Sequence, residues 1–371
     1  MEKQQLSHFQ FIAILLWSVM GTGILTLPWA IGQFVIRDSW ISALMLLFVP
    51  VLASGVALLF VRTFPGQSLV EGLMTALGPW FGRAGALWFL IWLFLLNAMV
   101  LRELLVYVEN SILPYTPINI LSGLAVVAMA YVTASKIEVI GRIAAFFTPT
   151  AFLITAVLLA LAVPHMDFSR LLPVFADGWR PVLRGSVIPW SWAAETLSAL
   201  QFATALSNKG KFIGRDFLIV GLLMTILGGM AEVVITSVLG EQRINSLFPI
   251  LEVVRTIQFS EFLERLDPLY VMGTTLLILI KVAVYNYSFC TGMEQVFRLK
   301  SYTAVVWGGV LPLWAASLFF WRDSASLAEY ILFTVPVYYI GTMFGLPVLA
   351  VVVQWIRQHW VHSVGGLSPE S

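Results

Sequence analysis

Apolar runs recur along the whole chain, each roughly 20 residues long, the length that spans about 30 Å of hydrocarbon as an α-helix. The alternating pattern of membrane barrel strands is absent. Composition agrees with helices in a bilayer, because 59% of the residues are hydrophobic and 11% are charged, too few for the surface of a soluble domain. We therefore expect an all-α integral membrane protein in which residues 1–371 form a single transmembrane domain.

The apolar runs predict ten spans. They cover about 9–35, 40–62, 86–107, 118–134, 142–163, 187–206, 215–239, 268–292, 302–320 and 329–356. The third span is expected to end in a polar turn containing Arg102, Glu103 and Glu109. Before it, residues 62–85 should form a loop that holds a short amphipathic helix, and residues 240–267 should form an amphipathic segment along the membrane surface.

The start of the chain predicts how it sits in the membrane. Ser7 and Gln10 have the spacing of a capping box just before the first apolar run. That run is too long for a cleavable signal peptide, so we expect it to be retained as a signal anchor. Lysines of the short segment 208–211 mark a cytoplasmic loop, and ten spans then put both termini in the cytoplasm.

Two glycines and a proline interrupt the first span in the run Gly21-Thr22-Gly23-Ile24, with Pro28 one turn on. Glycine weakens a helix, and proline removes an amide donor and clashes with the preceding turn. Unwound backbone at membrane depth is tolerated where it is packed in protein or lines a cavity. The interruption therefore predicts a binding site, with residues 21–24 contacting the ligand. The alternative is a kink or a notch for helix packing.

The sixth span is interrupted in a similar way. Pro189, Ser191, Trp192 and Glu195 lie within one hydrophobic segment. Ten spans divide into five plus five, so the sixth occupies the position of the first in the second half. Interrupted helices at matching positions of inverted repeats are typical of a transporter site at the membrane midplane. We expect inverted repeats at about 9–163 and 187–356.

These features together resemble the spore-germination permease family. The resemblance rests on the glycine motif at 21–25 with Pro28, on Ser191-Trp192-Ala193-Ala194-Glu195 in the sixth span, and on ten spans in 371 residues. Members are the B-type membrane subunits of nutrient germinant receptors and belong to the amino acid/polyamine/organocation transporter superfamily. The resemblance implies a LeuT-like five-plus-five fold with broken helices one and six.

The resemblance also implies a function and a setting. It implies a nutrient, often an L-amino acid, bound between spans one, three, six and eight, with span ten as a further candidate. It further implies a multi-pass protein of the cell membrane, specifically the spore inner membrane, and a hetero-oligomer with a soluble-domain membrane subunit and a lipoprotein subunit. The alternative function is an autonomous amino-acid transporter that is proton-coupled or uncoupled.

Several polar side chains lie within lipid-length runs and should therefore face the protein interior. Glu195 could bind a substrate ammonium or simply cap a broken helix, and Trp192 could close over the ligand or only pack. Asn97 and Tyr285 are further candidates for ligand contact. Glu232 is expected in a structural role or an ion-pair network.

Lys281 lies near the middle of the eighth span. In sodium-coupled relatives of this fold, span eight faces span one across a cation site, so the ammonium could replace a coupling ion. Two alternatives remain: the side chain could reach along its stem to the interface, or it could pair with Glu232.

Other classes of function find no support in the sequence. The four histidines lie near the termini or in a loop, and the single cysteine, Cys290, allows neither an internal disulfide nor a cysteine metal cluster. We expect no enzyme, no cofactor and no metal. A net charge of +1 gives no reason to expect a nucleic-acid partner.

Overall fold

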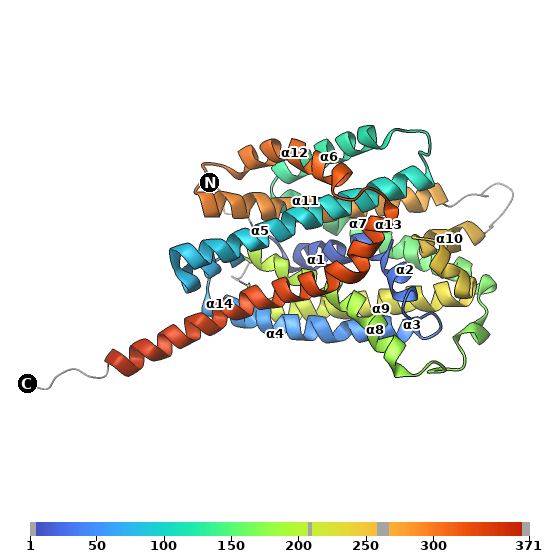
Figure 1. The fold of residues 1–371 in the computed structure, drawn as a ribbon, viewed down its shortest axis with the longest axis horizontal. Coiled ribbons are helices and arrows are strands. Elements are labelled where there is room, and N and C mark those ends of the chain that lie inside the picture. Colours follow the sequence, from blue (N-terminus) through green and yellow to red (C-terminus); the bar gives the residue numbers. More distant parts are fainter. Residues whose placement is uncertain (1–4, 207–209, 258–266, 366–371) are drawn as a thin grey trace, which may run out of the picture.

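The computed structural model describes residues 5–206, 210–257 and 267–365, and these are almost entirely helical (Figure 1). Among the described residues, seven helices are long and apolar enough to cross a membrane. They are the segment formed by α3 (Ser39–Leu44), η1 (Met45–Leu47) and α4 (Phe48–Thr63); α5 (Leu69–Ser111); α7 (Ile137–Ala162); α9 (Ile213–Leu239); α11 (Asp267–Phe297); α12 (Tyr302–Phe319); and α13 (Ser324–Glu329) with η8 (Tyr330–Thr334) and α14 (Val335–Gly365).

The other three predicted spans are short or interrupted helices. Span one consists of α1 (His8–Gly23) and α2 (Leu27–Gly32), and span four is α6 (Ile118–Ala134). Span six is α8 (Trp179–Ala194), continued by η4 (Glu195–Gln201) and η5 (Ala203–Ala205). The prediction of an all-helical membrane bundle with broken helices one and six is therefore confirmed. The boundaries of the two repeats stay a prediction.

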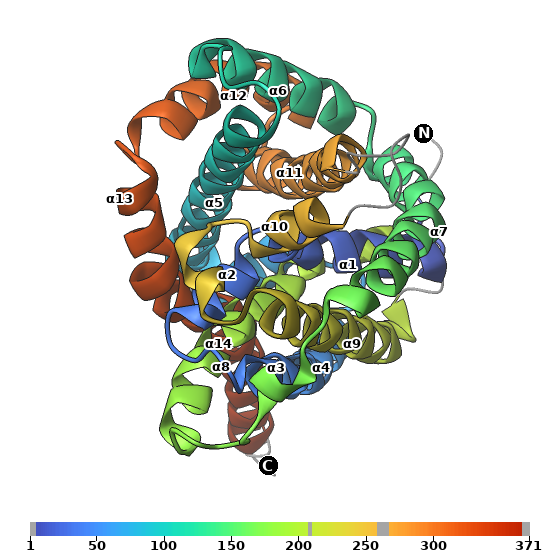
Figure 2. The same ribbon diagram turned by 90° about the vertical axis from the view of Figure 1, so that its right-hand side faces the viewer.

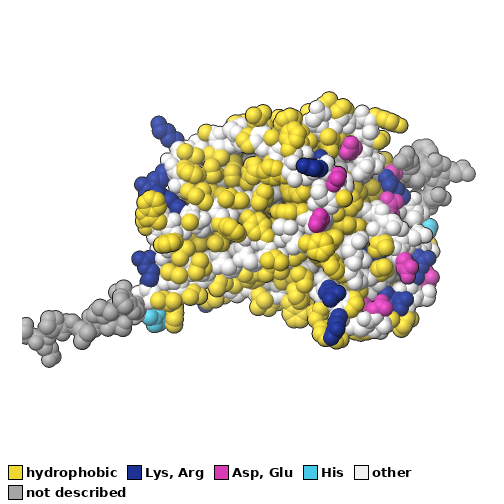
Figure 3. Space-filling view, viewed as in Figure 1, with side chains coloured by type: hydrophobic (Ala, Val, Ile, Leu, Met, Phe, Trp, Pro, Cys, Tyr) yellow, Lys and Arg dark blue, Asp and Glu magenta, His cyan; other side chains and the backbone are white. Residues whose placement is uncertain are grey.

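The helices run between two polar ends of the bundle. Hydrophobic side chains cover the middle of the visible face, and charged side chains gather toward both ends (Figure 3). The first and last helices meet the same end. There the amide of Leu6 donates to the Ala205 carbonyl over 2.7 Å, and Arg357 near the end of α14 donates to the Ala76 carbonyl over 2.9 Å. The arrangement fits an even number of crossings.

The start of α1 is fixed at this end by its own sequence. Ser7 and Gln10 form the predicted capping box. His8 then lies 2.6 Å from a carboxylate oxygen of Asp216 at the start of α9. The first turn of span one is thus held both by its cap and by a contact to span seven.

Two details of the third span differ from the prediction: it begins at Pro79 rather than at about 86, and it does not end in the polar turn. Gly78 has a φ of 81°, a left-handed conformation suited to glycine, and it separates the short helix 69–77 from the span that begins at Pro79. The expected polar turn was wrong, because Arg102 and Glu103 are buried inside α5, which continues to Ser111. Charged residues near the end of an apolar run usually mark the helix end, whereas here Glu103 lies inside the bundle, where it accepts a hydrogen bond from Thr26.

At the opposite end, α10 (Pro249–Thr256) lies across the bundle beside α9 and α11 (Figure 2). Its buried side chains are Pro249, Leu251, Val253 and Val254, so it packs as the predicted amphipathic segment. Residues 258–266 of that prediction lie outside the described residues.

Candidate ligand site at the two helix interruptions

The interruption of span one is a tight turn between α1 and α2. The amides of Leu25 and Thr26 both donate to the carbonyl of Thr22, over 2.9 and 3.2 Å. Pro28 lies in the first turn of α2, where a helix has no internal partner for an amide. Ile24 and Thr26 still donate to carbonyls four residues back, whereas Leu25 donates only three residues back and Pro28 has no amide to donate. The helix is therefore disturbed between Gly23 and Leu27, where the glycine and proline positions predict it.

Span six changes its geometry at Glu195. Pro189 lies inside α8 and cannot donate a backbone hydrogen bond. Five residues later α8 ends at Ala194, and the chain continues as the 3₁₀ helix η4 from Glu195. The carboxylate therefore projects from the point where one helix type gives way to the other.

Lys281 of α11 joins the two interruptions. Its Nζ lies 2.9 Å from Glu195 Oε2 and donates to Thr22 Oγ1 over 2.8 Å. The Tyr285 hydroxyl, one turn on, lies 2.8 Å from the same carboxylate oxygen and 3.1 Å from the Ser18 carbonyl. Lys281, Glu195 and Tyr285 are completely buried. One ion pair with its hydrogen bonds thus connects spans one, six and eight.

Gly21 and Trp192 enclose this ion pair. A Cβ at Gly21 would lie 3.1 Å from the Leu277 carbonyl and 3.2 Å from Lys281 Cβ, so glycine allows α1 and α11 to approach closely. The ring of Trp192 is buried, with its centroid 5.9 Å from Lys281 Nζ, within the range of a cation–π contact.

The other predicted contact residues lie apart from the ion pair or bond within their own helices. Asn97 donates to the Leu93 carbonyl over 2.9 Å, and Ser191 donates to the Ile188 carbonyl over 2.7 Å. Gly23 and Ile24 face a cavity next to the turn. Six of the predicted residues therefore form one cluster: Gly21, Thr22, Trp192, Glu195, Tyr285 and Lys281. Among the described residues, no hydrogen bond links Asn97 or Ser191 to this cluster.

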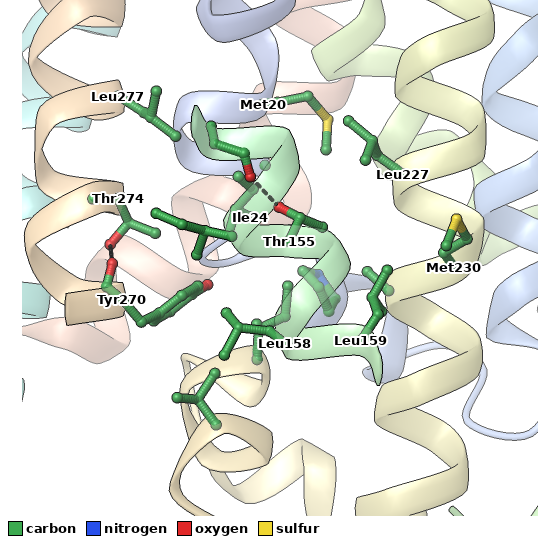
Figure 4. Close-up of a pocket in the computed structure, with 18 of the residues that line it drawn as sticks. Met20, Ile24, Thr155, Leu158, Leu159, Leu227, Met230, Tyr270, Thr274 and Leu277 are labelled. Atoms are coloured by element: carbon green, nitrogen blue, oxygen red, sulfur yellow. Dashed lines mark hydrogen bonds between the residues drawn. The ribbon is translucent and has the colours of Figure 1, made fainter. Parts of the chain in front are cut away.

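The cavity beside Gly23 and Ile24 has a volume of about 300 Å³ (Figure 4). Span one forms one wall, and α3 with η1, α7, α9, α10 and α11 form the others. Its labelled lining is mostly aliphatic: Met20, Ile24, Leu158, Leu159, Leu227, Met230 and Leu277, with Thr155, Tyr270 and Thr274. The interruption of span one thus borders a charged cluster and an apolar cavity.

Two residues that sequence reasoning did not assign to the site also contact span one. Glu103 of α5 accepts a hydrogen bond from Thr26 Oγ1 over 2.9 Å. Arg243 of η7 (Gly240–Asn245) donates to the carbonyl of Pro28 and lies 2.6 Å from Glu232 Oε2. The charge of each residue could have marked it as part of the site. Glu103, however, lies near a predicted span end, and Arg243 lies in a predicted surface segment.

The sequence matches known proteins over most of its length. The model of the family described as spore germination protein matches residues 5–320. The chain belongs to the spore germination protein family. Among relatives from Bacillus subtilis (strain 168), spore germination protein KB is 27% identical over 314 residues, covering 81% of each chain. Spore germination protein A2 is 21% identical over 326 residues, covering 87% of this chain and 88% of the relative.

The fold of this germination-family member is also found in a solved structure of low sequence identity. The structure of MhsT in complex with L-phenylalanine matches with a TM-score of 0.61 at 14% identity, covering 95% of this chain and 99% of that one. The likeness establishes a LeuT-like fold. Together with the family, it makes this chain a multi-pass membrane protein of the germinant-receptor or transporter-like kind.

Proposed function

We propose that this chain is the nutrient-binding membrane subunit of a spore germination receptor, and that it binds an L-amino acid between the interruptions of spans one and six. The observation that carries the proposal is the buried Lys281–Glu195 ion pair, 2.9 Å long, at the point where both helices are interrupted. Buried charges at membrane depth are rare and usually mark a functional site.

An amino acid fits the chemistry of this cluster. The ligand carries one ammonium and one carboxylate, and the cluster offers Glu195 to the first and Lys281 to the second. The ends of interrupted helices add partial charges that favour the same groups. The neighbouring cavity, lined by residues such as Ile24 and Leu277, suits an aliphatic or aromatic side chain. We therefore favour a nonpolar L-amino acid.

Lys281 has a further proposed role as a surrogate cation. Its ammonium, which extends from span eight, contacts both Thr22 of span one and Glu195 of span six, as a bound ion would. Binding should then not require sodium. Trp192 would close over the ligand, and Gly23 would leave room for it next to the backbone.

The proposed setting follows the family. The protein would lie in the spore inner membrane with both termini in the cytoplasm, and its repeats would cover about 9–163 and 187–356. It would assemble with a soluble-domain membrane subunit and a lipoprotein subunit. Genes for such partners beside this gene would support the receptor; a lone gene in an organism that forms no spores would contradict it.

Thermal-shift measurements on the purified protein test the ligand. The panel contains the proteinogenic L-amino acids, their D-enantiomers as matched controls, and nucleosides. A rise in melting temperature with one or a few nonpolar L-amino acids, and none with the D-forms, is expected. A response confined to nucleosides would refute the amino-acid proposal.

The second candidate function is an autonomous amino-acid transporter. The fold match over 99% of the MhsT chain, which was solved in complex with L-phenylalanine, favours it, since interrupted helices at matching positions of inverted repeats are typical of transporters. Proteoliposomes containing only this chain separate the two functions. Uptake of the ligand identified by thermal shift, with or without a proton gradient, supports the transporter, whereas binding without uptake supports the receptor.

A further inference from the structure

Glu103 places a second buried carboxylate on the turn between α1 and α2. Its side chain is 1% exposed, and Oε1 accepts the hydrogen bond from Thr26. The amide of Thr26 in turn donates to the carbonyl of Thr22, whose hydroxyl accepts from Lys281. The same turn of span one therefore contacts Lys281 at one end and Glu103 at the other.

The charges around this turn do not balance. Glu103 interacts electrostatically with both Lys281 and Glu195, so two carboxylates share one ammonium. Arg102, the neighbouring cation on α5, interacts instead with Glu109 and Asp323. The hydroxyls of Tyr285 and Tyr339 also face the cluster but carry no charge. An unbalanced buried charge is unfavourable enough that such a group normally binds a proton or a counterion.

Each carboxylate has one oxygen left over. Glu103 Oε2 and Glu195 Oε1 are buried and accept no hydrogen bond from the part of the chain that the structure describes. An ammonium provides three donors and one positive charge, which are the groups the turn lacks. A proton on Glu103 Oε2 also balances the charge when no ligand is present.

We propose that Glu103 carries a proton in the empty site and that the ammonium of the ligand replaces it. The exchange is balanced: the O–H bond of the Glu103 carboxylic acid breaks, the proton leaves to water, and the carboxylate formed accepts a hydrogen bond from the incoming ammonium. The ammonium replaces the positive charge of the proton, and the ligand carboxylate adds one negative charge, which Lys281 and the free amides at the helix interruption receive. The ammonium half rests on the proposed amino-acid function, whereas the proton on Glu103 does not.

Infrared difference spectroscopy of the purified, ligand-free protein tests the proton. The carboxylic-acid C=O band that shifts in heavy water should be lost in Glu103→Gln, which keeps the oxygen that accepts from Thr26. Glu232→Gln, which removes a buried carboxylate that has its own cation in Arg243, is the matched control and should retain the band. Thr26→Val, which removes the hydrogen bond to Glu103, should move the band without abolishing it. A band that survives Glu103→Gln and ignores Thr26→Val overturns the proton assignment.

Proton release tests the exchange. The probe is an equimolar mixture of the proteinogenic L-amino acids, with the N-acetylated mixture as control, added to weakly buffered protein with a pH indicator. Wild type should release protons with the free amines and none with the acetylated mixture. Glu103→Gln should bind more weakly, and it should release no protons even at amino-acid concentrations that restore its thermal shift. Release unchanged in Glu103→Gln overturns the exchange. If wild type shows neither shift nor release, the amino-acid proposal and the exchange both fall, while the infrared result still decides the proton.

Discussion

Lys281 and Glu195 form a buried ion pair at 2.9 Å, although each lies within a different apolar span. The lysine therefore neither reaches an interface nor pairs with Glu232, the two alternatives that the sequence leaves open. Glu232 has a cation of its own in Arg243, 2.6 Å away. The described residues thus include two separate ion pairs between fully buried side chains, one at the interruptions and one beside α2, the second half of span one.

The two glycines of the span-one motif should respond differently to a methyl group. At Gly21 a Cβ would lie 3.1 Å from the Leu277 carbonyl, so Gly21→Ala must push α11 away. At Gly23 the nearest atom would be Met20 Sδ at 3.5 Å, an ordinary contact. We expect a lower melting temperature for Gly21→Ala and little change for Gly23→Ala.

A larger side chain at Gly23 separates folding from binding. Leucine there would fill space between Met20 and Trp192, so Gly23→Leu should insert in the membrane but lose the ligand-induced thermal shift. A normal ligand response in Gly23→Leu would remove the turn from the binding site.

Arg243 should hold α2, the second half of span one, in place. Besides Glu232, its guanidinium contacts Ser39 Oγ at 2.7 Å, Thr236 Oγ1 at 3.0 Å and the Pro28 carbonyl. Arg243→Met leaves Glu232 buried without a cation and should lower stability by roughly 3–5 kcal/mol. Arg243→Lys should recover little, because one ammonium cannot reproduce the planar fork. Denaturant titration in detergent measures both, and Glu232→Gln combined with Arg243→Met is the control that should regain stability.

Much of the fold could be predicted from the sequence, because apolar runs of membrane length leave few alternatives to membrane-spanning helices. Gly21, Gly23 and Pro28 predicted the turn correctly, because backbone chemistry acts locally. Charged residues inside the spans were also correctly predicted to face the protein interior, but the sequence does not show which side chains they contact there. Lys281 had three possible partners or environments, and packing among spans one, six and eight decides among them.

The residues that were missed share a physical reason. Glu103 follows Arg102 near the end of a hydrophobic run, and such a pair usually marks a helix end. Only the contact from Thr26, a residue far away in sequence, shows that the carboxylate belongs to the site. Asn97 shows the converse, since its amide donates within its own helix to Leu93.

Cysteine labelling tests the topology. Gly210 and Gly240 have φ values of 72° and 56°, where cysteine would be strained, so the exposed neighbours Lys211 and Glu241 are better positions. Lys211→Cys should react with an impermeant reagent from the cytoplasmic face and Glu241→Cys from the opposite face. The native Cys290 is 1% exposed and should stay silent. Labelling of both new cysteines from one side would contradict ten spans.

Removing the charges of the Lys281–Glu195 pair one at a time tests whether they compensate each other. Lys281→Met leaves Glu195 buried without a cation and should lower stability by roughly 3–5 kcal/mol, measured by denaturant titration in detergent. The double variant Lys281→Met with Glu195→Gln carries neither charge and should regain most of that loss. A double variant as unstable as the single one would mean that the lysine contributes through packing alone.

Lys281→Arg distinguishes a surrogate cation from a simple charge. Arginine keeps the positive charge but is a wider planar group, and the space between Thr22 and Glu195 admits a compact ammonium. Lys281→Arg should therefore fold, because Glu195 still has a cation, yet lose most of the ligand-induced thermal shift. In wild type the same shift should be equal in sodium and in potassium buffers, since the lysine already occupies the cation position. A full ligand response from Lys281→Arg would reject the surrogate role, because the space would then admit a cation of another shape. Strict sodium dependence of the wild-type response would reject it as well, because a separate cation would then be required although Lys281 is present. Either result would leave the ion pair and the turn of span one in place.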